Sequence, residues 1–396
     1  MNSAIESLLK LKIYCEDEGY KGWDPYDGLN SKIFQLLPLK YFSVTRWVWI
    51  QLFKRSPINL RKLFLVPKKY NSKGLALLLS GYCNLYLLAE GGDKSFGLKS
   101  ELYQKIVDIS KLLESKKVRN YSGDCWGYSF DWQARRLFFF PKNTPTVVAT
   151  SFCAEALFQA YEVTKDKLIL ESAISSGEFI VNDLKRIVHN SGFLFSYSPL
   201  DGNNSVYNAT LLGAKVLSMC YKYTGDNKYK ELAYESIKAV CEGQSEDGSW
   251  IYGLLRIQSW KDSFHTGYNL ESIAMYKECT KDDSFDPYIE KGFDYYITHF
   301  FKEDGTPKYY HDKTYPIDIH CSGQLFSTLL KLNKYNSHSE LAKKVLDWTT
   351  TNMQDQRGFF YYQFKNTFSS KISYMRWSNA FMFNALTNLV IAEKNG

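Results

Sequence analysis

Side chains that can transfer protons gather in two short runs of the chain. One run contains Trp260, Asp262, His265, Tyr268 and Asn269, and the other contains Tyr309, Tyr310, His311, Asp318 and His320. Histidine and tyrosine can remove a proton from a substrate and return it, while Arg, Asn or His can hold a nearby anionic group. Aromatic rings also provide platforms for sugar rings. The two runs therefore predict acid–base chemistry on a sugar.

The elements that position these runs repeat along the chain. Gly192, Gly248, Gly305 and Gly358 each open an aromatic-rich extended stretch, as in Asp247-Gly248-Ser249-Trp250. These glycines are spaced about 55 residues apart, and a period of this size indicates a repeat architecture. Apolar helices, which must be buried, alternate with amphipathic helices between the turns. The apolar stretches cover residues 74–89, 150–163, 209–223, 265–279, 318–332 and 375–392.

The alternation predicts a closed ring. The last apolar helix has no amphipathic helix after it, whereas residues 5–14 form a spare amphipathic helix at the N-terminus. We therefore predict an all-α fold, an (α/α)6 toroid with short aromatic-rich extended turns between its hairpins. Residues 1–72 would close the ring and line its mouth, and residues 73–396 would supply the helical hairpins of the same single domain.

All inner helices of such a ring run in the same direction, so the segments that precede them meet at one mouth. The predicted catalytic residues there are His265, Tyr310, Tyr207, Tyr268, His320, Asp318 and Asp124. The predicted substrate-binding residues are Trp23, Asp24, Asp27, Trp126, Asp131, Trp132, Arg135, Asn208, Trp260, Asn269, Tyr309, Arg376 and Trp377. Simpler roles compete, because Asp262 and Asp318 stand where helix caps do and Trp126 or Trp132 can wedge between helices.

Three chemistries fit these residue types. Abstraction of the C5 proton of a uronate needs His265 or Tyr310 as base, Tyr207 or Tyr268 as acid, and Arg376 with Asn208 on the carboxylate. Glycoside hydrolysis needs two carboxyl groups, and the candidates are Asp24, Asp27, Asp124, Asp131, Asp262 and Asp318. A zinc site would use Asp124-Cys125, His265 and Asp318-Ile319-His320-Cys321, although no familiar ligand spacing is present. A glycan-binding subunit without catalysis is the non-enzymatic alternative.

Composition narrows the class of protein. Hydrophobic residues make up 45%, the formal net charge is +7, and 16% of residues are aromatic. No apolar run reaches the roughly 20 residues of a membrane span, and no signal peptide is visible, so we expect a cytoplasmic protein with reduced cysteines. Basic residues gather between Lys54 and Lys69, which favours an anionic ligand or a solvated loop over nucleic acid. We expect no cofactor and no bound metal.

The repeated turns resemble those of the six-hairpin toroids found in glycoside hydrolases, polysaccharide lyases and sugar epimerases. Terpene cyclases and prenyltransferase β-subunits carry a turn similar to Asp247–Trp250, but their Asp-x-Asp-Asp and Asp-x-Cys motifs are absent here. The run Tyr374-x-Arg376-Trp377 is similar to a C-terminal motif of glucuronyl C5-epimerases. This resemblance covers residues 73–392 and implies a carbohydrate-active enzyme.

A second resemblance covers the whole chain. The runs Trp23–Ser31, Pro316–Cys321 and Arg376-Trp377 resemble a bacterial group encoded among surface-polysaccharide biosynthesis genes. That group is sometimes labelled delta-aminolevulinic acid dehydratase, a (β/α)8 barrel with a Schiff-base lysine, and the absence of strand–helix alternation argues against the label. The resemblance implies a polysaccharide or lipid-linked oligosaccharide substrate and association with polysaccharide assembly machinery.

Overall fold

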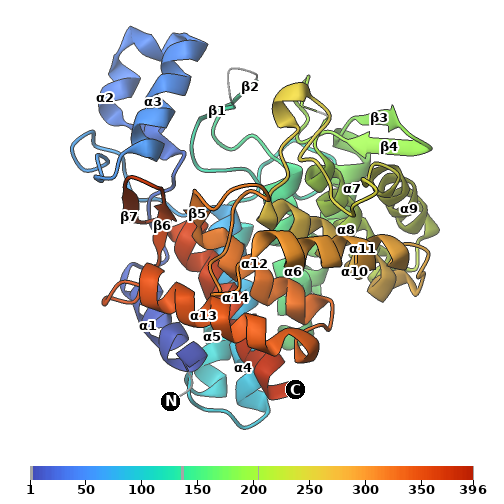
Figure 1. Ribbon diagram of the computed structural model, residues 1–396. Coiled ribbons are helices and arrows are strands. Elements are labelled where there is room, and N and C mark those ends of the chain that lie inside the picture. The colour runs from blue at the N-terminus through green and yellow to red at the C-terminus, as the bar shows by residue number, and fades with distance from the viewer. Residues whose placement is uncertain (1–2, 135–137, 204, 396) are drawn as a thin grey trace.

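The inner layer of the molecule is a ring of helices. The computed structural model describes residues 3–134, 138–203 and 205–395, and within these ranges successive inner helices contact each other and the last contacts the first (Figure 1). The inner helices are α4 (Ser72–Glu90), α6 (Val147–Thr164), α8 (Tyr207–Thr224), α10 (Ser263–Thr280), α12 (Ile319–Lys331) and α14 (Phe381–Asn395).

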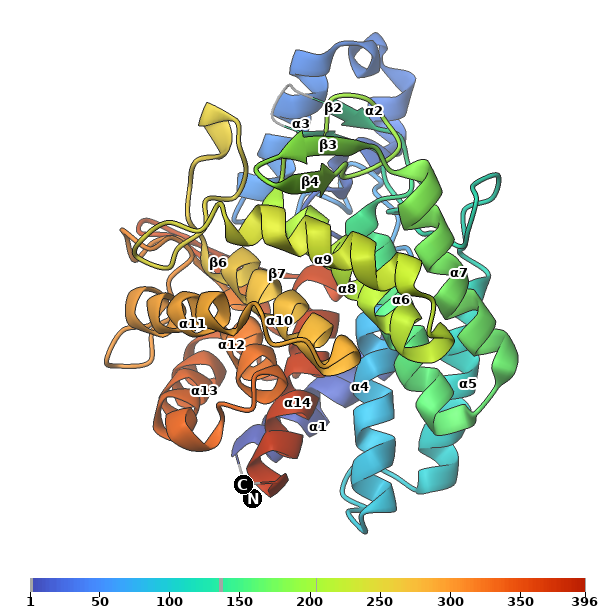
Figure 2. The same cartoon turned by 90° about the vertical axis from the view of Figure 1, so that its right-hand side faces the viewer.

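An outer layer covers this ring. Each inner helix contacts an outer helix, and Figure 2 shows α7, α9 and α11 on the outside of α6, α8 and α10. The outer helices are α1 (Ser3–Asp17), α5 (Lys99–Glu114), α7 (Lys167–Asp183), α9 (Asn227–Cys241), α11 (Asp286–Phe300) and α13 (Ser339–Met353). Helix α1 packs on α14 and α13, so the N-terminus provides the outer partner of the last inner helix. The predicted all-α (α/α)6 toroid is confirmed.

The two layers follow from the pattern of apolar residues. Every residue of α8 from Tyr207 to Cys220 is buried, as a helix packed on all sides requires. In α9, the buried residues Tyr229, Ala233, Ile237 and Val240 instead follow one stripe at spacings of three and four. The stripe of α9 packs on α8, and the opposite face of α9 meets solvent.

The turn glycines allow the segments between helices to pack closely against the outer helices. A Cβ on Gly248, Gly305 or Gly358 would lie 2.3 Å from a carbonyl oxygen of α11, α13 or α1. Gly192 makes the same approach to α9, where a Cβ would lie 2.2 Å from a carbonyl oxygen. The contact of Gly358 with Lys10 therefore puts α1 in the position that α9, α11 and α13 occupy in earlier repeats.

Replacing Gly248 with Ala is expected to destabilise the fold. Gly248 has φ +88°, and its new Cβ would meet the carbonyl oxygen of Lys291 at 2.3 Å. Gly225 is a matched control because it also has a positive φ, +72°, but no heavy atom within 4 Å. We expect losses of unfolding free energy of at least about 2 kcal/mol for Gly248→Ala and about 1 kcal/mol for Gly225→Ala in urea titrations. Equal losses would contradict the docking contact.

Short antiparallel strands build the links that lead into inner helices. Their pairs are β1 (Trp132–Ala134) with β2 (Phe138–Phe140), β3 (Arg186–His189) with β4 (Gly192–Phe195), and β6 (Tyr361–Phe364) with both β5 (Ile317–Asp318) and β7 (Ser369–Ser373). Asp318 stands opposite Gln363 in this last sheet. A π-helical turn, η5 (Met375–Ala380), precedes α14 and was not visible in the sequence pattern.

A helical insertion projects beside the mouth of the ring (Figure 1). It consists of α2 (Lys32–Leu36), a 3₁₀ turn (Pro38–Tyr41) and α3 (Ser43–Arg55), and Pro38 separates the two helices. Leu29, Phe34 and Ile50 form a small core that is separate from the core of the ring. No helix in the described parts of the chain combines the length and the hydropathy that crossing a bilayer requires.

Candidate functional site

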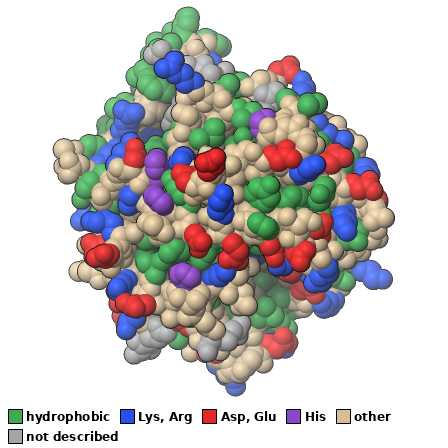
Figure 3. Space-filling model, turned by 45° about the vertical axis from the view of Figure 1, so that its right-hand side comes forward, with side chains coloured by type: hydrophobic (Ala, Val, Ile, Leu, Met, Phe, Trp, Pro, Cys, Tyr) green, Lys and Arg blue, Asp and Glu red, His purple; other side chains and the backbone are tan. Residues whose placement is uncertain are grey.

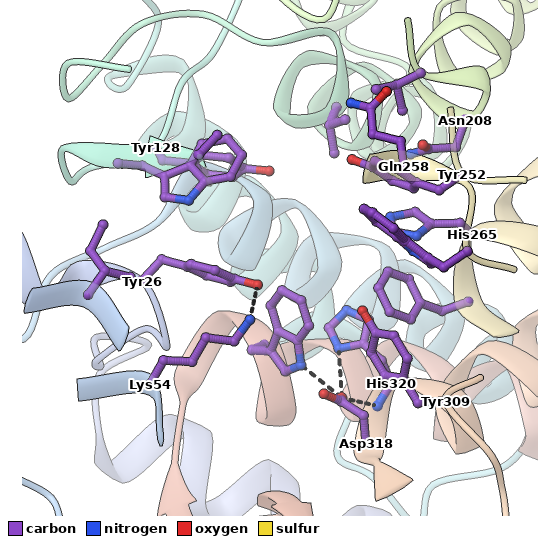
Figure 4. Close-up of a pocket in the computed structure, with 18 of the residues that line it drawn as sticks. Tyr26, Lys54, Tyr128, Asn208, Tyr252, Gln258, His265, Tyr309, Asp318 and His320 are labelled. Carbon is purple, nitrogen blue, oxygen red and sulfur yellow. Dashed lines mark hydrogen bonds and ion pairs between the residues drawn. The ribbon is translucent and has the colours of Figure 1, made fainter. Parts of the chain in front are cut away.

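A cavity of about 680 Å³ lies where the inner helices begin. The second residue of every inner helix lines it when η5 is counted as the start of the last one. These residues are Lys73, Val148, Asn208, Phe264, His320 and Arg376. The parallel helices thus bring side chains that are far apart in the sequence to one place, and Figure 4 shows several of them around the cavity.

His265 is held by a buried carboxylate. It lies in the first turn of α10, and the helix cap Asp262 accepts a hydrogen bond from its backbone N–H at 3.0 Å. The other oxygen of Asp262 lies 2.8 Å from Nδ1 of His265 and accepts a hydrogen bond from Nε1 of Trp260 at 2.8 Å. A carboxylate beside Nδ1 favours the tautomer with its proton on that atom and leaves Nε2 able to accept a proton.

His320 is a second imidazole in the cavity, and it is almost fully buried. Its ring stacks on Phe381 with centroids 3.8 Å apart and lies 4.3 Å from the ring of Trp377. Burial, together with the positive charges of Lys73 and Arg376, holds the pKa of His320 well below its usual value. Its Nδ1 atom is buried and has no hydrogen-bond partner among the described residues. The same environment that keeps His320 neutral also makes it a weaker base than an ordinary histidine, so its role in the cavity is that of a neutral hydrogen-bonding group.

Asp318 is the only carboxylate among the described residues that line the cavity. It caps α12 through the backbone N–H of His320 and accepts hydrogen bonds from Trp377 Nε1 at 2.9 Å and Gln363 Nε2 at 3.0 Å. Burial raises the pKa of Asp318 to about 6, although these donors oppose the shift. The carboxyl group can therefore carry a proton near neutral pH.

This raised pKa predicts a pH dependence of stability. The folded state holds the proton of Asp318 more tightly than the unfolded state, so the unfolding free energy falls as pH rises from about 4 to about 6. The shift corresponds to about 3 kcal/mol at full ionisation. Urea titrations across this pH range should show a steeper fall of the unfolding free energy in the wild-type protein than in Asp318→Asn. The groups that titrate in both proteins cancel when the two curves are compared. Parallel curves would contradict the raised pKa.

Two buried cations lie at the inner end of the cavity. Lys73 donates to the hydroxyl of Tyr268 at 3.2 Å, and its Nζ lies 3.9 Å from the ring centroid of Phe152. Burial and the nearby charge of Arg376 depress the pKa of Lys73 well below its usual value. Arg376 donates from Nε and Nη2 to Asp24 at 2.5 and 2.8 Å. Arg376 is already paired with Asp24, whereas an anion beside Lys73 would raise the depressed pKa of that amine and favour its charged form.

Aromatic rings form the walls. Tyr252 stacks on Trp260 with centroids 4.5 Å apart and planes 13° apart, and Trp132 stacks on Phe140 at 5.0 Å and 17°. The hydroxyl of Tyr26 accepts a hydrogen bond from Lys54 of α3 at 2.7 Å, as Figure 4 shows. Flat rings on several sides with polar groups between them suit a sugar, whose faces are apolar and whose edges are hydroxylated.

Two amide oxygens near His265 have no partner. The Oδ1 atoms of Asn208 and Asn269 are buried and accept no hydrogen bond from the described residues. Both residues line a small pocket beside His265, and Asn208 also lines the main cavity. An unpaired buried acceptor costs about 1–3 kcal/mol, so these atoms are suited to accept hydrogen bonds from a bound molecule.

The structure brings most of the predicted residues together. Those that line the cavity are Trp132, Asn208, Trp260, His265, Tyr268, Tyr309, Tyr310, Asp318, His320, Arg376 and Trp377. Asn269 lies in the adjoining small pocket. Arg135 falls outside the described residues. Asp262 and Asp318 are indeed helix caps, and they also contact the two histidines of the site.

Other predicted residues lie away from the cavity. Tyr207 is the first residue of α8 and its hydroxyl lies 3.2 Å from Nε2 of His189, so it does not serve as an acid in the cavity. Asp124 pairs with Lys117 at 2.6 Å on the outside of the ring. Asp131 accepts a hydrogen bond from the backbone N–H of Lys142 at 2.7 Å and so fixes a turn.

The remaining misplaced residues have structural roles. Trp126 is fully buried and donates to the carbonyl oxygen of Leu113 at 2.9 Å, which makes it a wedge at the end of α5. Trp23 donates to the carbonyl oxygen of Val66 at 2.9 Å. The carboxylates of Asp24 and Asp27 are paired with Arg376 and Arg61, and these ion pairs hold the N-terminal segment against η5.

Several lining residues were not predicted to be site residues. They are Tyr26, Lys54, Lys73, Tyr128, Tyr197, Tyr252, Gln258, Tyr362 and Gln363. Lys73 could have been recognised as a site residue from the sequence, because a lysine near the start of a buried apolar helix does not contribute to apolar packing. Lys54 comes from α3 of the helical insertion, which lies outside the repeats, and Gln258 comes from a short 3₁₀ turn; the repeat pattern therefore gave no position for either side chain.

The cysteines are buried thiols. All eight are unpaired, and burial raises the pKa of Cys125 to about 12 and the pKa of Cys321 well above its usual value. Among the described residues, no group of three or more His, Cys, Asp or Glu side chains is arranged to hold a metal ion. Cys125 and Cys321 belong to the hydrophobic core.

The sequence matches no family model and no curated protein. The structure is similar to a cellobiose 2-epimerase from Bacillus thermoamylovorans, with TM-score 0.61 and 15% identity over 83% of this chain and 90% of that one. It is similar to an unsaturated glucuronyl hydrolase specific for heparin, with TM-score 0.61 and 13% identity over 99% and 97%. A GH76 α-mannanase from Bacteroides thetaiotaomicron gives 0.60 and 14% over 82% and 87%. Likeness at this identity shows a shared fold.

Proposed function

We propose that this protein is a carbohydrate-active enzyme that removes the C5 proton of a uronate residue in a glycan, as an epimerase or a lyase. The observation that supports this proposal most is that His265 and His320 both line one aromatic cavity. One imidazole is oriented by Asp262 and the other is kept neutral by burial. His265 is the candidate that takes the proton from carbon, and His320 is a neutral partner for the substrate.

Each remaining requirement of the reaction has a candidate residue. The C5 proton is acidic only while the adjacent carboxylate is stabilised, and Lys73 lies in the same cavity as a candidate donor to that carboxylate. The unpaired Oδ1 atom of Asn208 can accept a hydrogen bond from a sugar hydroxyl. A substrate carboxylate beside Lys73 would raise the depressed pKa of that amine, so anion and proton would bind together. Tyr268 donates the return proton in this scheme, because burial raises the pKa of its phenol and keeps it protonated.

The similar structures support a sugar substrate. They include an epimerase and two glycosidases by their names, one of which acts on an unsaturated glucuronyl group. The role in surface-polysaccharide biosynthesis, including association with the assembly machinery, is proposed from the sequence resemblance alone.

A glycoside hydrolase is the second candidate. The raised pKa of Asp318 is the property that a general acid of such an enzyme needs. The described lining provides no second carboxylate to act as nucleophile or base, which is why proton abstraction is preferred.

Isotope exchange tests the proposal. The purified protein is incubated in heavy water with uronate-containing glycans, and mass spectrometry and NMR follow deuterium at C5, while ultraviolet absorbance follows the unsaturated product of a lyase. We expect deuterium or the unsaturated product, and neither with the carboxyl-reduced glycan. New reducing ends without deuterium would favour hydrolysis. Glycan binding without any change in the glycan would favour a non-catalytic subunit.

A further inference from the structure

The helical insertion of residues 32–66 exposes an unusual amount of apolar surface. Among the described residues, it holds eleven of the twenty-four exposed large hydrophobic side chains. They are Ile33, Leu36, Leu39, Tyr41, Phe42, Val44, Val48, Leu52, Ile58, Leu63 and Leu65. Leu36 is 86% exposed and Tyr41 is 73% exposed, so these side chains are not half-buried members of a core. An apolar surface of this kind marks an interaction site.

Helix α3 is apolar on two opposite faces. Ile50 and Phe53 face inward and are buried, whereas Val44, Val48 and Leu52 follow a second stripe at spacings of four and are exposed. The inner face explains how the insertion is held on the ring. Among the described residues the outer stripe is left exposed, and in Figure 3 hydrophobic side chains gather on this projecting part of the molecule.

The charge of the insertion has one sign. No Asp or Glu occurs between Asp27 and Glu90, whereas residues 32–69 contain nine Lys and Arg residues. Lys32, Arg55 and Lys62 are exposed beside the apolar side chains. Exposed leucine, phenylalanine and tyrosine flanked by lysine and arginine form the pattern of a surface that rests in the interface of an anionic bilayer.

We propose that the helical insertion docks this protein on the surface of an anionic lipid bilayer. The apolar stripe of α3, with Leu36, Tyr41 and Phe42 at its end, enters the headgroup layer, and the flanking basic residues contact lipid phosphates. The insertion projects from the ring (Figure 1), and its exposed apolar stripe, flanked by basic side chains, suits the surface of an anionic bilayer.

Docking also orients the cavity. Trp47, Gln51 and Lys54 of the same helix α3 line the cavity, while Val48 and Leu52 lie on its exposed face. The mouth therefore lies close to the headgroup layer, where a glycan attached to a lipid would be presented. This consequence rests on the proposed function, whereas bilayer docking does not.

Vesicle co-sedimentation of the full-length protein tests the proposal. We expect binding to vesicles of phosphatidylglycerol and phosphatidylcholine in equal amounts, and an apparent affinity lower by at least about tenfold in Val48→Asp/Leu52→Asp. Leu168→Asp on α7 is a matched control, because Leu168 is 73% exposed and lies outside the insertion. Circular dichroism checks folding, and Leu36→Asp/Phe42→Asp is a second patch variant.

Charge provides an independent measurement. Lys32→Gln/Lys62→Gln should weaken binding to the anionic vesicles by about fivefold for each charge removed, and salt should do the same. Vesicles of phosphatidylcholine alone should bind weakly.

Absence of vesicle binding by the wild-type protein would overturn the proposal, as would equal binding by the patch variants. A self-associated species in sedimentation velocity that Val48→Asp/Leu52→Asp dissolves, without vesicle binding, would overturn it in favour of a protein contact. C5 exchange on a soluble glycan should be unchanged in Val48→Asp/Leu52→Asp.

Discussion

Replacing His265 with Gln is expected to lower the rate of C5 deuterium exchange by about 10³-fold, within the range that a general base contributes. Gln keeps a polar group of similar size at the start of α10 but cannot accept a proton at neutral pH. The helix cap through the backbone N–H of His265 and Asp262 does not depend on the side chain. The fall should therefore appear in kcat with an unchanged free energy of unfolding.

A second variant distinguishes the loss of the base itself from the loss of the carboxylate that orients it. Asp262→Asn keeps an oxygen for the cap but no longer favours the proton on Nδ1 of His265, so the pH profile of kcat should shift together with its height. His338→Gln is the matched control, because His338 lies outside the cavity at the start of α13. Full activity in His265→Gln would exclude His265 as the base.

The fold could be predicted because its repeat depends on local residues. Gly248, Gly305 and Gly358 recur at a regular spacing because each makes the same close contact between a turn and an outer helix. An alanine at any of these positions would clash with that helix. Apolar and amphipathic helices alternate along the chain, and the last apolar helix has no amphipathic helix after it. Closing the ring gives this last inner helix an outer partner. No long-range information was needed for this step.

The site could be predicted only in part, because position along the chain does not give the direction of a side chain. His320 and Asn208 are second residues of inner helices and face the cavity, whereas Tyr207 is one residue earlier and faces His189. One residue is a rotation of about 100° on a helix. Asp24 was predicted to bind substrate, and its ion-pair partner Arg376 is too distant in sequence to be recognised as such.

The ion pair between Asp24 and Arg376 carries the largest expected effect on stability. Both side chains are about 5% exposed, and the pair joins the N-terminal segment to the π-helical turn before α14. Asp24→Ala leaves the guanidinium of Arg376 buried without its carboxylate. Removing one partner of a buried pair costs about 4 kcal/mol, which urea unfolding at neutral pH would measure. The exposed pair of Glu6 and Lys10 is the control, and Glu6→Ala should leave the midpoint of urea unfolding unchanged.

A double variant identifies the source of that loss. Arg376→Met replaces the charge with an apolar side chain of similar length, so Asp24→Ala should cost about 2 kcal/mol less in the Arg376→Met background than in the wild type. The same loss in both backgrounds would assign it to the hydrogen bond that Asp24 accepts from the backbone N–H of Tyr26 at 3.0 Å. Coupling of the expected size would show that the ion pair between Asp24 and Arg376 holds the N-terminal segment on the turn before α14 and so helps to close the ring.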